Sequence, residues 1–229
     1  MEVLKKVAEE FFGNEFECKI YSNGITLASK DNSKAFCFGL MSYDSSFRIR
    51  ENVYAIKNFE EVESILQPLL KKYKVSQGDF EMGMYGVDYK GTIKKGMPMK
   101  EIAGVDTSFI EDMTNIDGGD EAQIVRVLSE FKKVIVYLED EFINRYKTLQ
   151  QVYEALKSMT PKERGELLMM PSPIKRMVID VLCVPPADLD SMFESAIADF
   201  KEAEKEHSVF KNYYKVVEGL YHYFKSQKT

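Results

Sequence analysis

The chain has 229 residues, of which 45% are hydrophobic and 30% are charged, and its formal net charge is −6. This composition is typical of a folded globular protein and excludes a disordered chain. Residues 1–115 hold 15 basic against 18 acidic side chains, and residues 116–229 hold 16 against 19. Neither half therefore has the basic surface that general nucleic-acid binding requires.

Residues 1–12 have the apolar spacing of a short amphipathic helix. Strand-like runs follow over 16–42, and Asn23-Gly24 between the first two predicts a hairpin with a type I′ turn. The run that begins at Phe47 alternates apolar and basic side chains, which is typical of a strand with one face in solvent.

Asn58 is followed three residues later by Glu61, and this capping-box pattern predicts that a helix begins there. Short glycine-bearing strands are expected over 79–93. Together these elements predict an α+β domain over residues 1–116, made of an N-terminal helix and an antiparallel β-meander.

The C-terminal half, residues 117–229, is predicted to be all-helical. Asp120 is expected to cap a helix, and because no glycine or proline interrupts 120–158, one helix of ~35–40 residues fits that range. A second apolar stripe with helical spacing runs over 189–224, with a bend expected near His207. We expect two long antiparallel helices that pack on each other as a helical hairpin or bundle.

Shorter helices are expected between these two, the first of them capped by Thr160 with Glu163. His207 occupies a position of the second stripe, between Ala203 and Phe210, so its ring is predicted to be at least partly buried. The stripe positions predicted to lie in the core are Phe131, Leu138, Phe200, Phe210 and Val217.

Catalytic motifs are absent from the sequence, which has no GxSxG, no phosphate-binding glycine loop and no HExxH. Glu204 and His207 have the spacing of a di-iron ligand pair, but Gly219 stands where the matching glutamate before His222 would be. The sequence therefore predicts no catalytic residue, no metal site and no cofactor.

Three cysteines without CxxC spacing predict reduced, buried thiols. The N-terminal stretch MEVLKKVAEEFFG lacks the continuous apolar region of a signal peptide, and the aliphatic runs are too short to span a bilayer. We expect a cytoplasmic protein without a membrane segment.

A methionine-rich segment over 167–182 is the first candidate binding surface. Methionine suits adaptable protein-binding surfaces and also fills irregular cores, so both an exposed and a core location remain open. The residues of this segment that would contact a partner are Leu167, Met169, Met170, Ile174 and Met177.

A basic stretch with glycines is the second candidate. Lys90, Lys94, Lys95 and Lys100 bring four positive charges into eleven residues without an acid. Such a loop can hold a phosphate or an acidic partner, and the alternative is a solvated hairpin. Lys94 and Lys95 are the expected contact residues.

The first hypothesis for function is a non-catalytic, cytosolic protein-binding module. Its partner would be another protein, as for an inhibitor, an adaptor, or a neutraliser of the immunity, antitoxin or counter-defence type. The alternative is a small-molecule or nucleotide-handling enzyme that uses carboxylates for acid–base chemistry, with Lys94 and Lys95 holding phosphate. Self-association through the apolar stripes is a third hypothesis.

Overall fold

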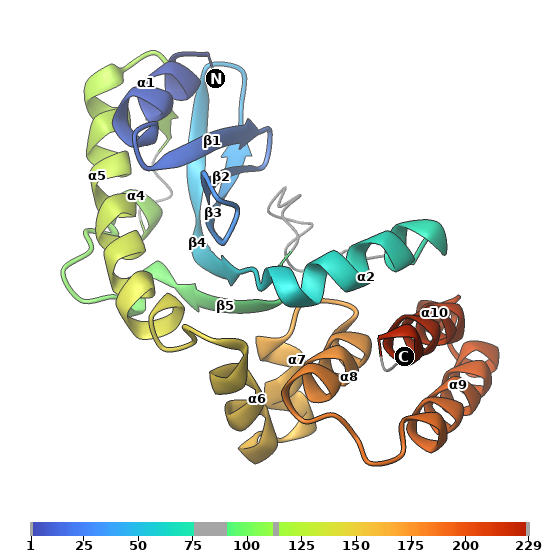
Figure 1. Cartoon of the computed structure of the whole chain (residues 1–229). Coiled ribbons are helices and arrows are strands. Elements are labelled where there is room, and N and C mark those ends of the chain that lie inside the picture. The colour runs from blue at the N-terminus through green and yellow to red at the C-terminus, as the bar shows by residue number, and fades with distance from the viewer. Residues whose placement is uncertain (1, 76–90, 112–114, 228–229) are drawn as a thin grey trace. The chain divides into compact units, whose positions relative to one another are not determined.

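The structure is a computed structural model that describes residues 2–75, 91–111 and 115–227. Its contacts divide the chain into two compact units, and each unit is discontinuous in sequence. The sheet unit consists of residues 1–58 and 79–147, and the helical unit of residues 59–78 and 148–229. Figure 1 shows the elements of both units, coloured from blue at the N-terminus to red at the C-terminus.

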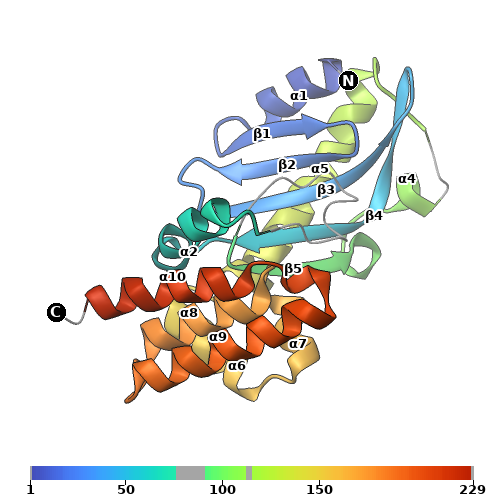
Figure 2. The same cartoon turned by 90° about the vertical axis from the view of Figure 1, so that its right-hand side faces the viewer.

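The sheet unit is built on an antiparallel sheet in the order β1-β2-β3-β4-β5, with β6 paired to β4. Figure 2 shows the first five strands side by side. The strands are β1 (Phe16–Tyr21), β2 (Gly24–Ser29), β3 (Lys34–Ser42), β4 (Ser46–Lys57), β5 (Ile93–Pro98) and β6 (Ile116–Asp117). This sheet and the helix α1 (Glu2–Phe12) confirm the predicted N-terminal helix and antiparallel meander.

Aromatic rings belong to the core of the sheet unit, in which α1 contacts both β1 and α5 (Glu121–Leu138). Phe38 of β3 stacks on Phe131 of α5, with ring centroids 3.9 Å apart. Phe16 of β1 meets Phe36 of β3 edge-on at 5.9 Å. Buried aromatic pairs contribute about 0.5–1.5 kcal/mol beyond the area that they bury. The apolar stripe of α5 therefore packs on the sheet, and Phe131 is in the core as predicted.

The remaining elements of the sheet unit are short. They are the 3₁₀ turn Met99–Glu101, α4 (Ser108–Glu111) and a π-helical turn, Glu139–Ile143, which follows α5. The helical unit contains α2 (Glu60–Lys72), α6 (Leu149–Ser158), α7 (Pro161–Leu167), α8 (Ser172–Cys183), α9 (Leu189–Glu206), the 3₁₀ turn Ser208–Phe210 and α10 (Tyr213–Ser226). None of the helices in the described ranges has the length and apolar character that crossing a bilayer requires.

The predicted pairing of one long helix over 120–158 with another over the second apolar stripe is wrong, because α5 packs within the sheet unit. The second stripe itself forms two antiparallel helices, α9 and α10. Their ring contacts run in opposite chain directions, since Phe193 meets Tyr221 at 5.7 Å and Phe200 meets Tyr213 at 5.6 Å. The expected bend near His207 is confirmed, because α9 ends one residue before it. These observations confirm an α+β chain with a helical C-terminal half.

Two predicted helix caps are confirmed. The Asp120 side chain accepts hydrogen bonds from the backbone N–H groups of Ala122 and Gln123, at 3.0 and 3.1 Å. Thr160 and Glu163 form a complete capping box at the start of α7. Each cap supplies acceptors for N–H groups that have no partner within the helix, and is worth about 1 kcal/mol.

The prediction of one continuous helix over 120–158 is wrong. α5 ends at Leu138, and after the π-helical turn the backbone of Thr148 is extended, with a ψ of 155°. Thr148 then forms a capping box with Gln151 and starts α6. A capping box satisfies the free N–H groups of a new first turn, so a second helix replaces the continuation of the first.

The predicted capping box at Asn58 is also wrong. Phe59 is the N-cap residue of α2 and makes no side-chain cap. Asn58 is engaged with the turn before β3 instead, because its backbone N–H donates to the Ser33 carbonyl at 2.8 Å and its Nδ2 donates to the Asn32 carbonyl at 3.3 Å. These contacts direct its amide away from the helix terminus.

The first hairpin is confirmed, but its predicted turn type is wrong. Tyr21 pairs with Gly24, so Ser22 and Asn23 form the loop and Gly24 belongs to β2. Neither Asn23 nor Gly24 has a positive φ, which a type I′ turn would require. Gly24 also pairs with Gly39 of β3, and this second ladder holds it in the extended strand.

The contacts divide the chain differently from the predicted boundary at residues 116 and 117. They join α5 to the sheet, and they join α2 to the helices of the C-terminal half. That residues 1–116 and residues 117–229 each fold by themselves stays a prediction.

Candidate functional site

The methionine-rich segment lies mostly in the core of the helical unit. Leu167, Met169 and Ile174 are buried, while Met170 and Met177 are half-buried. α8, which carries the last part of the segment, packs on both α2 and α6. This burial favours the core interpretation of the segment and leaves little of it for contact with a partner.

The basic stretch that was expected to be a loop is an edge strand in the described residues. Lys94 and Lys95 are consecutive in β5, opposite Ile56 and Ala55 of β4. Because successive side chains of a strand point to opposite faces, the two ammonium groups diverge; Lys94 is buried and Lys95 is exposed. They do not form a joint phosphate-holding loop, and Lys90 lies outside the described residues.

A second group of lysines lies where β3 and β4 meet the π-helical turn. Lys34 pairs with Glu139, and Lys57 Nζ donates to the Ile143 carbonyl at 3.0 Å. Partial burial lowers the pKa of Lys57, and the neighbouring charges of Lys34 and Lys147 lower it further. Both Lys34 and Lys57 are thus bound to protein groups, which indicates a structural role.

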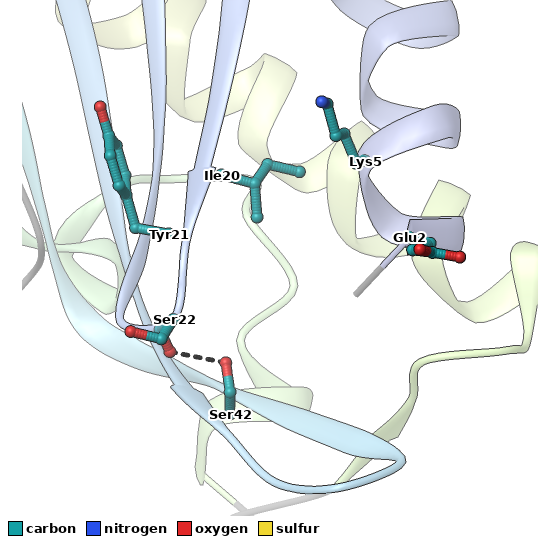
Figure 3. A pocket seen from close by; sticks show the side chains of 6 residues that line it. All are labelled: Glu2, Lys5, Ile20, Tyr21, Ser22 and Ser42. Atoms are coloured by element: carbon teal, nitrogen blue, oxygen red, sulfur yellow. Dashed lines mark hydrogen bonds between the residues drawn. The ribbon is translucent and has the colours of Figure 1, made fainter.

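Figure 3 shows a hollow of about 330 Å³ between α1 and the first hairpin. Ile20 lies on its wall, whereas the Tyr21 ring extends from the other face of β1. The Ser42 hydroxyl donates to the Ser22 carbonyl at 2.6 Å and is therefore already used. The exposed lining of this hollow is mostly apolar, whereas binding sites for small molecules usually have several polar groups that converge on the ligand.

The connection between α9 and α10 exposes apolar side chains. We call Phe200, His207, Val209 and Phe210 the hairpin tip. Val209 is 58% exposed, which makes it the most exposed large apolar side chain in the described part of the chain. Phe200 and Phe210 are half-buried, with ring centroids 6.2 Å apart, and the His207 ring lies 6.2 Å from Phe210. The hairpin tip therefore has one exposed aliphatic side chain, Val209, beside two partly exposed aromatic rings.

The hairpin tip is held in place by Asn212. This residue adopts a left-handed backbone, with a φ of 66°, which asparagine tolerates better than most residues. Its backbone N–H donates to Glu204 at 3.0 Å, and its Nδ2 donates to the Tyr73 carbonyl at 3.0 Å. These bonds connect the turn to α9 and to the end of α2.

The predicted burial of Phe200, Phe210 and His207 is wrong, whereas Leu138 and Val217 are buried as predicted. Among the described elements, α9 packs mainly on α10, and Phe200 and Phe210 are half-buried at this end of the hairpin. His207 is exposed because it follows the last residue of α9 with an extended backbone.

The end of α9 also separates Glu204 from His207, the two residues that have the spacing of metal ligands. Glu204 belongs to α9 and accepts the Asn212 N–H, while His207 lies beyond the helix. The two side chains therefore do not share a helical face. Across the residues that the structure describes, no three histidine, cysteine, aspartate or glutamate side chains gather as metal ligands would.

Sequence reasoning missed the hairpin tip because periodicity assigned Phe200 and Phe210 to the core. Two local signals mark the interruption of the stripe. Ser208 follows His207 at the expected bend, and Asn212 is a residue type favoured just before a helix. Val209 falls off the apolar stripe, which is consistent with its exposure.

Comparison with protein-family models, with curated proteins and with solved structures finds no match for this chain.

Proposed function

We propose that this chain is a non-catalytic protein-binding module, of the inhibitor, neutraliser or adaptor kind, and that it binds its partner through the hairpin tip. The observation that carries the proposal is the 58% exposure of Val209 in a turn that also holds the half-buried ring of Phe210, which packs on Phe200. Protein interfaces concentrate their binding energy in a few apolar and aromatic anchors of this kind.

The ordered turn supports this choice of surface. Because Asn212 already bonds to Glu204 and Tyr73, a partner would not have to order the backbone of the tip. Binding to a preorganised surface avoids the entropic cost of fixing a mobile loop.

The alternative, an enzyme with a phosphate-holding basic loop, has less support. Lys94 and Lys95 diverge on β5, and the Lys34 and Lys57 ammonium groups are bound by protein acceptors. Our proposal includes a cytoplasmic location, which is supported by the free thiols of Cys18, Cys37 and Cys183, because secreted proteins usually pair their cysteines.

A capture experiment from an extract of the native host tests the proposal. The wild-type chain and Val209→Asp would be compared, since a carboxylate at an exposed anchor should abolish capture without affecting the melting temperature. Val136→Asp is the matched control, because Val136 is 54% exposed on α5. We expect wild type and the control to retain the same stoichiometric partner.

Retention of that partner by folded Val209→Asp would show that the hairpin tip is not the binding surface. Turnover of a small substrate that survives Val209→Asp and is lost when an internal carboxylate is replaced would refute a non-catalytic role.

A further inference from the structure

β1 is the outermost strand of the sheet and pairs only with β2 among the described strands (Figure 2). Tyr21 and Gly24 flank a two-residue loop, so they exchange backbone hydrogen bonds with each other. Because alternate residues of an antiparallel strand bond to the same side, the backbone of Lys19 also faces β2, whereas the backbones of Cys18 and Ile20 face away from the sheet. β1 therefore presents N–H and carbonyl groups along an open edge.

These outward groups are available to an added strand. No hydrogen bond joins the backbone N–H or carbonyl of Cys18 or Ile20 to another residue in the described ranges. β1 contains no proline, and its register with β2 is uninterrupted, so it lacks two of the devices that commonly protect a sheet edge. Extended peptides bind to edges of this kind as an additional strand.

One face of β1 is apolar and lies against α1. Phe16, Cys18 and Ile20 point to this face, since side chains alternate along a strand. The Phe12 ring of α1 lies 6.3 Å from the Phe16 ring, and the Ala8 carbonyl accepts a hydrogen bond from Cys18 Sγ at 3.4 Å. Ile20 is half-buried on the wall of the mostly apolar hollow beside α1 (Figure 3). Apolar side chains of an added strand would cover this surface.

The other face of β1 carries charge. Glu17 and Lys19 are exposed there and pair with each other at 3.5 Å. Because the backbones of both residues face β2, each would form a non-hydrogen-bonded pair with an added strand, and side chains come closest in such pairs. Opposite charges across two strands stabilise their pairing, whereas like charges oppose it. The two residues therefore favour a base opposite Glu17 and an acid opposite Lys19.

We propose that the open edge of β1 binds an extended segment of another protein as an added antiparallel strand. The segment has apolar side chains on the α1 face, and on the other face a basic residue opposite Glu17 and an acidic residue opposite Lys19. The antiparallel direction continues the pairing of β1 with β2 and of β2 with β3. The hairpin tip belongs to the other compact unit, so this inference does not rest on the proposed function.

A second copy of the chain fits this edge poorly because of α1. Two copies paired through β1 about a two-fold axis would have their α1 helices on the same face of one continuous sheet. Among the strands in the described ranges, α1 packs mainly on β1. Neighbouring strands lie about 4.8 Å apart, whereas packed helices need about 8–10 Å between their axes. The two helices would therefore collide, while a single extended segment brings no helix to this face.

Two heptapeptides with blocked termini test the proposal. The first, TVEVKVT, places its glutamate opposite Lys19 and its lysine opposite Glu17 when it pairs antiparallel to β1. The second, TVKVEVT, exchanges the two charges at the same composition. We expect calorimetry to show about ten-fold tighter binding of the first peptide. Amide hydrogen exchange should show new protection of the Cys18 and Ile20 N–H groups, but not of the Lys19 N–H, which already bonds to β2.

Exchanging the charges on β1 provides a reciprocal variant. Glu17→Lys with Lys19→Glu leaves the net charge unchanged and should reverse the preference, so that the second peptide binds more tightly. The matched control is Glu154→Lys with Lys157→Glu, which exchanges an exposed ion pair on α6 and should keep the preference of the wild type. Melting temperatures establish that both variants are folded.

Backbone methylation of the first peptide tests the pairing itself. A methyl group on the central valine nitrogen removes the N–H that would donate to the Cys18 carbonyl, so this peptide should not bind. A methyl group on the glutamate nitrogen, which would face solvent, should leave binding intact.

Failure of the first peptide to bind would overturn the inference. So would an equal affinity of the two peptides for the wild-type chain and for the charge-exchanged variant, or binding that the central methyl group does not change. If the wild-type chain instead forms dimers that protect the Cys18 and Ile20 amides without any peptide, a second copy occupies the edge and the inference is wrong.

Discussion

Lys175 and Glu63 form an ion pair inside the helical unit, with Nζ and Oε1 3.0 Å apart and side chains that are only 1% and 6% exposed. The pair joins α8 to α2, and Gln67 Nε2 donates to the second Glu63 oxygen at 2.6 Å. Burial lowers the pKa of Lys175, and the Glu63 carboxylate opposes that shift. Moving each charge out of water costs free energy, and the attraction between the two partners offsets that cost only while both are present.

Lys175→Met alone should therefore lower the free energy of unfolding by about 3–5 kcal/mol, because the buried Glu63 carboxylate loses the ammonium group that offsets its charge. The double change Lys175→Met with Glu63→Leu should recover most of that loss. Urea denaturation of the single and double variants, combined as a double-mutant cycle, measures the coupling. Additive effects of the two substitutions would contradict the interpretation.

Phe131→Ala should destabilise the chain by about 3–5 kcal/mol, because this ring is fully buried and stacked on Phe38. Phe200→Ala should cost less, at most about 2 kcal/mol, since Phe200 is half-buried at the hairpin tip. Thermal and urea unfolding of both variants provide the comparison. An equal or larger loss for Phe200→Ala would mean that this end of α9 is core.

Asp31 should titrate at unusually low pH. Ser29 Oγ donates to its carboxylate at 2.6 Å, and the Ser33 N–H and hydroxyl donate as well, which lowers the pKa of Asp31 from 3.8 to about 2. The folded pKa lies below the unfolded value, so this stabilisation is complete above about pH 4 and is lost as pH falls toward 2. A carboxyl titration by NMR measures the midpoint, and a midpoint near 3.8 would refute these bonds.

The three thiols should differ in reactivity toward a disulfide reagent. Burial raises the pKa of Cys37 to about 12 and, with Glu9 and Glu17, that of Cys18 to about 11. Cys183 is only half-buried, and burial raises its pKa as well. At about pH 8 we expect Cys183 to react first and Cys37 only on unfolding, since the thiolate is the reactive species. Mass spectrometry of time points would order them, and early labelling of Cys37 would be the contrary result.

Local chemistry explains which elements could be predicted from the sequence. Asp120 and Thr160 mark helix starts because their side chains bond to N–H groups two or three residues away. The break before α6 was missed because apolar spacing continues through it and only Thr148 marks the new start. β5 was missed because its pairing partner in β4 is distant in sequence.

The hairpin tip could not be predicted for a different reason. A stripe of apolar positions shows that a helix has a face to bury, but not how many neighbours will cover that face. Phe193 of α9 is buried, whereas Phe200, two turns later on the same stripe, is only half-buried. Only the three-dimensional arrangement of α9 and α10 distinguishes these two rings.

The discontinuous helical unit has a consequence for how the chain is synthesised. α2 packs on α8 and α10, so it belongs with helices that the ribosome makes much later, after the whole of the sheet unit. Until α8 emerges, the Glu63 carboxylate on α2 has no Lys175 to pair with. The sheet unit can therefore complete its contacts before α8 is made, whereas α2 lacks its packing partners until α8 and α10 have emerged from the ribosome.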